Sequence, residues 1–246
     1  MRRIIHGTLY ARQPQPCGHT VRIHDLGHGH VEVTGSPRFI WEEVASLSPL
    51  ALADFEAARQ SSLAGGELPV PERELRDWAN RERATRRART CVRRLAKSKG
   101  LTVLLTLTYR ENMTDRDRMQ RDFDVFMKRL RRVSPGVQYI CVFERQKRGA
   151  WHAHIAVQRV LPWYLHKGQM VRSYDLLRSL WRAVVGADNG NVDVSRNKRV
   201  NRSSAKLASY LSKYIGKTFD QADKHVNSYS ASGRALPAAA VFQTVG

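Results

Sequence analysis

The sequence has little that would suit a secreted or membrane-spanning protein. Its three cysteines, Cys17, Cys91 and Cys141, are widely spaced and odd in number, so they indicate no disulfide framework. No run of about 18 apolar residues occurs, which argues against a transmembrane helix. The first residues, MRRIIHGTLYARQPQP, carry charge but no apolar segment of signal-peptide length. We therefore expect a protein of the reducing cytoplasm.

Acidic residues are scarce relative to basic ones. The 246-residue chain has 42 Lys and Arg against 22 Asp and Glu, a formal net charge of +20 at pH 7. Basic side chains that neutralise phosphates release condensed counterions, so this excess favours a polyanionic partner. Nucleic acid is the leading candidate. The plain alternatives are a membrane surface or a basic protein without a polyanionic partner.

The pattern of apolar residues predicts an alternation of strands and helices in the middle of the chain. In chain order, strand, helix, strand, strand, helix and strand are expected over 101–109, 114–133, 137–144, 150–160, 173–186 and 191–195. Thr114 is the expected N-cap of the first helix. This order is that of a split βαβ unit. The expected fold class is therefore α+β, with a ferredoxin-like antiparallel central sheet and helices packed on one face.

One main domain is expected over residues 81–220, on the basis of length and pattern. Residues 1–80 combine short β-favouring runs with an Ala-rich helix at 46–66 and a linker, ELPVPE. They form a small N-terminal region to which the sequence assigns no role. Residues 221–246 are expected to be a poorly ordered tail.

A helix expected at 73–99 is dense in arginine and has few acidic residues at i,i+4 spacing. One sign of charge at this density favours a surface that follows phosphates over a merely solvated helix face. A basic turn, RQKRG, and a last helix at 203–217 add further cations. The candidate nucleic-acid contacts are Arg86, Arg87, Arg93, Arg94, Arg145, Lys147, Arg148, Lys206 and Lys217.

The stretch VFERQKRGAWHAHIAV carries two histidines at strand spacing. Side chains two apart share one face of a strand, so His152 and His154 project together while Ala153 and Ile155 face the core. Glu144 lies across the expected hairpin and can reach them. Two neutral imidazoles and one carboxylate form an open three-ligand site for a divalent metal. The alternative is a pair of ordinary polar residues on a half-exposed sheet face.

The last expected helix, SSAKLASYLSKYIGK, has two tyrosines one turn apart. On a helical wheel Leu207, Ala208, Leu211 and Ile215 form the buried stripe. Tyr210 lies away from that stripe among Lys206, Lys213 and Lys217, and Tyr214 lies on the border. A phenol is a weak nucleophile unless cations or a metal-bound phosphate favour the phenolate. The alternative is that both tyrosines are packing residues with hydroxyls at the surface.

Three segments in this order, LLTLTY, Glu144 with HAH, and YLSKY, resemble the motifs of HUH endonucleases. The resemblance is to the rolling-circle replication initiators of bacteriophages and plasmids and covers roughly residues 85–220. It implies that His152, His154 and Glu144 bind Mg²⁺ or Mn²⁺. It also implies that Tyr210, with Tyr214 as a second tyrosine, is the nucleophile, and that Lys213 assists at the phosphate. Ala153 replaces the bulky apolar residue that the family has between its histidines.

The resemblance further implies an enzyme that nicks and joins single-stranded DNA at a replication origin through a 5′-phosphotyrosyl intermediate. It would act in the cytoplasm of a bacterial host. Because the chain has no G-x-x-x-x-G-K-[ST] segment, unwinding and synthesis would require a host helicase and polymerase. No membrane partner is implied.

Several other interpretations stay open. A transposase of the same superfamily shares the motif order, whereas conjugative relaxases place the tyrosine before the histidines. A non-catalytic module could bind single strands by stacking. A metal-dependent nuclease could hydrolyse DNA without a covalent step. A zinc site is less favoured than plain loop histidines for Cys17, His19, His24, His28 and His30.

Overall fold

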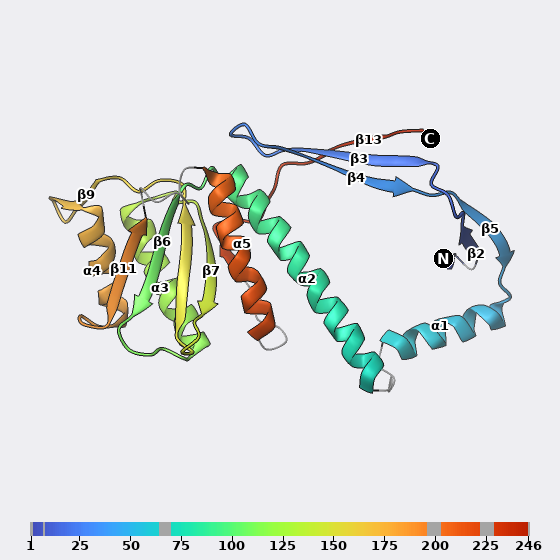
Figure 1. Ribbon diagram of the computed structural model, residues 1–246, viewed down its shortest axis with the longest axis horizontal. Coiled ribbons are helices and arrows are strands. Elements are labelled where there is room, and N and C mark those ends of the chain that lie inside the picture. Colours follow the sequence, from blue (N-terminus) through green and yellow to red (C-terminus); the bar gives the residue numbers. More distant parts are fainter. Residues whose placement is uncertain (1, 7, 64–69, 196–202, 222–228, 246) are drawn as a thin grey trace. The chain divides into compact units, whose positions relative to one another are not determined.

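The computed structural model describes residues 2–6, 8–63, 70–195, 203–221 and 229–245 (Figure 1). The chain divides into two compact units, each with its own sheets. The first unit contains Met1–Asp25, Val31–Asn80 and Ala238–Gly246, and the second contains Leu26–His30 and Arg81–Pro237. No helix in the described ranges has the length and hydropathy needed to span a bilayer.

The first unit holds two small antiparallel sheets of three strands each. Their strand orders are β1-β2-β5 and β13-β3-β4. The strands are β1 (Arg2–Ile5), β2 (Thr8–Arg12), β3 (Gly18–Asp25), β4 (Val31–Arg38), β5 (Trp41–Ser46) and β13 (Ala240–Gln243). Helix α1 (Pro49–Leu63) follows, and α2 (Val70–Ser98) then leads into the second unit. Helix α2 begins inside the segment that the sequence suggested as a linker.

The second unit is built on a five-stranded antiparallel sheet of order β11-β6-β8-β7-β12. Its elements are β6 (Val103–Tyr109), α3 (Arg116–Val133), β7 (Tyr139–Arg145), β8 (Trp151–Val157), α4 (Ser173–Val185), β11 (Gly190–Ser195), α5 (Ser204–Gln221) and β12 (Tyr229–Ala231). The four neighbours β11-β6-β8-β7 have the strand order of a split βαβ unit. The predicted α+β class with an antiparallel sheet is confirmed.

Helices cover both faces of this sheet, whereas the sequence suggested only one (Figure 1). Strand side chains alternate, so Leu105, Ala153 and Ile155 pack with α3 and α4. Their neighbours Leu104 and Ala156 pack with α5 and the later part of α2. The α3 and α4 side is filled by interlocking rings, including edge-to-face contacts between Phe126 and Trp181 at 5.8 Å and Phe123 and Phe143 at 5.3 Å.

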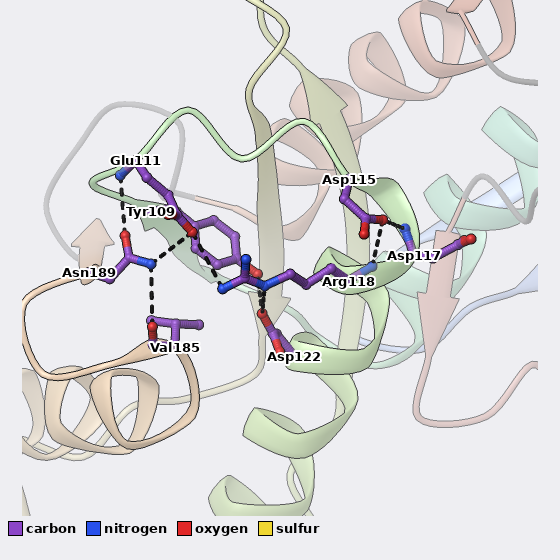
Figure 2. A network of polar contacts seen from close by, with 8 residues as sticks. All are labelled: Tyr109, Glu111, Asp115, Asp117, Arg118, Asp122, Val185 and Asn189. Carbon is purple, nitrogen blue, oxygen red and sulfur yellow. Dashed lines mark hydrogen bonds and ion pairs between the residues drawn. The ribbon is translucent and has the colours of Figure 1, made fainter.

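The start of α3 is held by polar contacts around the end of β6 (Figure 2). The Tyr109 hydroxyl donates to Asp122 Oδ2 at 2.7 Å. Asn189 Nδ2, in the turn before β11, donates to Glu111 Oε1 at 3.0 Å. The N-cap is Asp115, whose carboxylate accepts the N–H groups of residues 117 and 118. Thr114 was therefore the wrong cap, by one position.

The expected tail contains two strands instead. Strand β12 pairs with β7 at the edge of the central sheet, with Tyr229 opposite Val142. Strand β13 pairs with β3 in the first unit. Ser232, just after β12, accepts the backbone N–H of Tyr139 at 3.0 Å. A second unpredicted element is a hairpin of β9 (Trp163–His166) and β10 (Gln169–Arg172) that precedes α4.

Candidate functional site

The β7–β8 hairpin forms as the sequence predicts and brings the expected ligands onto one face of the sheet. Glu144 lies opposite His152, and Val142 lies opposite His154. Ala153 and Ile155 are fully buried on the other face. The histidines are not on a half-exposed surface, because only 9% of His152 and 5% of His154 is exposed.

His154 lies between a carboxylate and a hydroxyl. Its Nε2 is 2.9 Å from Glu144 Oε2, and its Nδ1 is 3.3 Å from Oγ1 of Thr106, the residue opposite it on β6. A neutral imidazole with its proton on Nε2 satisfies both contacts, since it donates to the carboxylate and accepts from the hydroxyl. The side chain of Glu144 is 12% exposed, so this pair is largely shielded from water.

His152 has a separate partner. Its Nδ1 is 3.0 Å from the amide nitrogen of Gln146, and its ring centroid is 6.4 Å from that of His154. Burial lowers the pKa of His152, the nearby charge of His154 lowers it further, and Glu144 acts in the opposite direction. The imidazole is therefore neutral at pH 7, the form that has a lone pair for a metal.

The spacing of His154 and Glu144 suits a divalent ion. Two ligands at right angles around Mg²⁺ lie about 3.0 Å apart when each bond is about 2.1 Å. The separation of His154 Nε2 and Glu144 Oε2, 2.9 Å, matches that geometry, with a cation in place of the shared proton. His152 lies on the same strand face without joining them. Within the described residues, no group of three or more His, Cys, Asp or Glu side chains is close enough to hold a metal ion.

Both tyrosines of α5 lie at this histidine. The ring of Tyr214 stacks on the imidazole of His154, with centroids 4.4 Å apart and planes 15° from parallel. The Tyr210 ring is perpendicular to the same imidazole at 6.3 Å. The Tyr214 hydroxyl donates to the Tyr210 oxygen at 2.5 Å. Burial raises the pKa of Tyr214 well above its ordinary value, and the bond to Tyr210 raises it further, so Tyr214 keeps its proton.

The packing of α5 explains this placement. The four residues expected in the buried stripe, Leu207, Ala208, Leu211 and Ile215, are fully buried against the sheet. Tyr214 is partly buried at the border, as the wheel predicts. Tyr210 was expected to lie far from the stripe, but it too is partly buried and packs against the same cluster. The helix therefore presents both phenols to the histidine face.

The expected cations surround the site to different extents. Lys206 and Lys213 are exposed on α5, and the side chain of Lys217 lies outside the described part of the chain. Arg145, Lys147 and Arg148 are exposed at the β7–β8 turn. On α2, Arg86, Arg87 and Arg93 are exposed and Arg94 is half-buried.

The β7–β8 turn is anchored by the loop before α3. Asn112 Nδ2 donates to the carbonyl of Arg148 at 3.2 Å. The Trp151 backbone N–H donates to Met113 O at 2.8 Å, and its indole N–H donates to Thr114 O at 3.1 Å. The start of β8, and with it His152, is therefore fixed from outside the hairpin.

Sequence reasoning missed Thr106 and Gln146. Thr106 interrupts the apolar run of β6 on the histidine face, and this was the available signal. Its meaning depended on β6 lying beside β8. The histidines of the first 30 residues form no metal cluster within the described ranges. One of them, His30, instead lies with Nε2 at 2.8 Å from Ser204 Oγ, in the first turn of α5.

Residues 102–219 match a family model of replication-associated proteins, described under the name Replication-associated protein ORF2. The matched segment begins just before β6 and ends within α5, so it includes Glu144, both histidines and both tyrosines. The match supports a role in replication initiation and is consistent with DNA as the partner. Comparisons with curated proteins and with solved structures gave no match.

Proposed function

We propose that the protein is a HUH-type endonuclease that nicks and rejoins single-stranded DNA at a replication origin and so starts rolling-circle replication. The observation that carries this proposal is the stack of Tyr214 on His154, with Tyr210 bonded to Tyr214. A phenol nucleophile and a metal ligand are thus side by side, on a segment that matches a replication-associated family.

The proposed cofactor is Mg²⁺ or Mn²⁺. His154 and Glu144 would hold it, and His152 would be a further ligand from the same strand face. When bound, the ion acts as a Lewis acid that polarises the scissile phosphate. The shielded position of His154 and Glu144 strengthens such an electrostatic effect, because little water screens it.

The chain's own residues then carry the transfer. The Tyr210 oxygen attacks phosphorus, and the bond from phosphorus to the 3′ oxygen breaks. The departing oxygen takes up one proton and becomes a 3′-OH, which balances the proton released from Tyr210. The products are a 5′-phosphotyrosyl enzyme and a primer end. The hydrogen bond from Tyr214 stabilises negative charge on the Tyr210 oxygen, and Lys213, exposed three residues after Tyr210, assists at the phosphate.

The covalent link stores the energy of the broken bond, so the strand can be rejoined. Tyr214 would take the second transfer. A host helicase and polymerase would supply unwinding and synthesis. A transposase would use the same site, but the match to a replication-associated family favours an initiator.

The test is to incubate the protein with 3′-labelled single strands and Mn²⁺ and to look for labelled protein on a denaturing gel. The wild type should give a covalent species, and Tyr210→Phe should abolish it. A labelled species that survives Tyr210→Phe combined with Tyr214→Phe would eliminate the tyrosine assignment. Cleavage that leaves a protein-free 5′ end would indicate a hydrolytic nuclease, and binding without cleavage a non-catalytic module.

A further inference from the structure

A hollow of about 350 Å³ lies beside the later part of α2, within the second unit. Three guanidinium groups surround it, and its floor is small and partly apolar. The lining residues are Arg86, Arg87, Thr90, Cys91, Arg94 and Leu236. The mechanism proposed above uses none of them.

Helix geometry explains why these side chains converge. Residues four apart lie on one side of a helix, so Arg86, Thr90 and Arg94 form one row. Arg87 and Cys91 form the adjacent row. The opposite wall is Leu236, which follows β12 and packs partly buried against the same apolar cluster as α5.

Side-chain contacts fix this opposite wall to the helix. The Tyr229 hydroxyl, on β12, donates to Cys91 Sγ at 3.2 Å, and the Arg234 guanidinium lies 5.0 Å above the Tyr229 ring. Strand β12 is itself paired with β7 of the central sheet. The hollow is therefore held between a helix and a sheet edge.

The lining fits a ligand that has both an anionic and a flat apolar part. Guanidinium groups bind phosphate oxygens in pairs and stack on planar rings. Arg86 already contacts Glu82 at 2.5 Å, but that pair is well exposed and a phosphate can compete with it. The volume falls at the lower end of the range for small-molecule pockets.

We infer that this hollow binds one nucleotide of the single-stranded DNA substrate, with phosphate on the arginines and the base against Cys91 and Leu236. The inference rests on the proposed function and deepens it, because it gives the enzyme a second grip on the strand away from the tyrosines. One bound nucleotide would fix the register of the strand relative to the nick.

Cys91 allows a direct test, since its sulfur lines the hollow. Oligonucleotides with one base carrying an activated disulfide, moved along the strand, would be mixed with full-length Cys17→Ser protein. Cys141 can stay, because it is fully buried. We expect cross-linking at one or two adjacent positions and none with Cys91→Ser. Equal, weak cross-linking at every position would overturn the inference.

A pair of matched charge reversals gives the second test. Arg87→Glu should weaken binding of single strands about 10-fold and lower the salt slope of log K by roughly 0.7. Arg89→Glu changes the charge equally on the far side of the helix, about 200° away, and should cost less than about threefold. Equal losses would show a general electrostatic field rather than a pocket.

Neither test requires cleavage. A protein that forms the covalent DNA species but neither cross-links nor distinguishes the two arginines contradicts the nucleotide pocket alone. A protein that cross-links through Cys91 but forms no covalent species at tyrosine contradicts the proposed chemistry alone.

Discussion

The two faces of the five-stranded sheet differ in what they bury. The face under α3 and α4 is filled with rings and aliphatic side chains such as Phe123, Phe126 and Trp181. The face under α5 buries His152 and His154, together with most of Glu144, beside its apolar residues. Burial of polar groups stabilises a fold weakly, and breaking up such a group costs more than it gained.

This difference separates stability from function. The apolar face gains free energy from area removed from water and from close packing. The histidine face gives up part of that gain, and it does so where two phenols of a covering helix meet the imidazoles. A polar cluster in that position is better explained by chemistry than by folding. Substitutions on the two faces should therefore have opposite signatures.

The largest effect is expected at the centre of the histidine face. His154→Gln should lower nicking at least about 1,000-fold, because it removes a proposed metal ligand while its amide still donates to Glu144. The measurement is single-turnover cleavage of labelled single strands with Mn²⁺. Urea unfolding should show that the variant stays folded. Nicking within about threefold of the wild type would refute the role of this histidine.

The reciprocal change lies on the apolar face. Phe126→Ala should lower the free energy of unfolding by about 3–5 kcal/mol, because it opens a cavity beside Trp181. The folded fraction should still nick at the normal rate. Val125→Ala is the matched control, since Val125 is the exposed neighbour on the same helix and should change little. Urea denaturation gives both values, and equal values for the two variants would contradict the proposed packing.

A smaller effect is expected from the second tyrosine. Tyr214→Phe keeps the ring that stacks on His154 but removes the donor to the Tyr210 oxygen. Nicking should slow about 10-fold, the scale of one hydrogen bond to a charged atom, with the adduct still formed. Rates of adduct formation under single-turnover conditions measure this. Complete loss of the adduct would instead make Tyr214 the first nucleophile.

The smallest effect concerns the cap that starts α3. Hydrogen bonds from the backbone N–H of residue 118, and then of 117, lower the pKa of Asp115 below its ordinary 3.8. A lowered carboxyl pKa contributes stability that is present above pH 3.8 and is lost as pH falls through the folded-state value. Asp115→Asn keeps a capping oxygen and does not titrate. Urea midpoints should therefore differ slightly at pH 7, with the gap changing only below about pH 4.

Local periodicity was enough to predict much of the histidine face. Alternation along β8 placed His152 and His154 together, and the wheel of α5 placed Leu207, Leu211 and Ile215 in the core. These patterns depend only on residues close in sequence. The hairpin with Glu144 depends on one short turn and was also predictable.

Features that depend on distant pairing were not predictable in the same way. Strands β12 and β13 are three and four residues long, and their partners lie far away in the chain, so no local pattern marks them. The contact of Thr106 with His154 required the order of strands. Thr114 and Asp115 are both good caps, and only backbone geometry decides between them.

The most direct test of the central claim is to locate the DNA link after trypsin digestion. Cleavage after Lys206 and Lys213 separates the tyrosines, because Tyr210 stays in the peptide LASYLSK and Tyr214 begins the peptide YIGK. Mass spectrometry of wild-type protein after one round of nicking should find the nucleotide on LASYLSK. A nucleotide found only outside these two peptides, or none on any tyrosine after complete cleavage of the strand, would contradict a phenol of α5 acting at the histidine face.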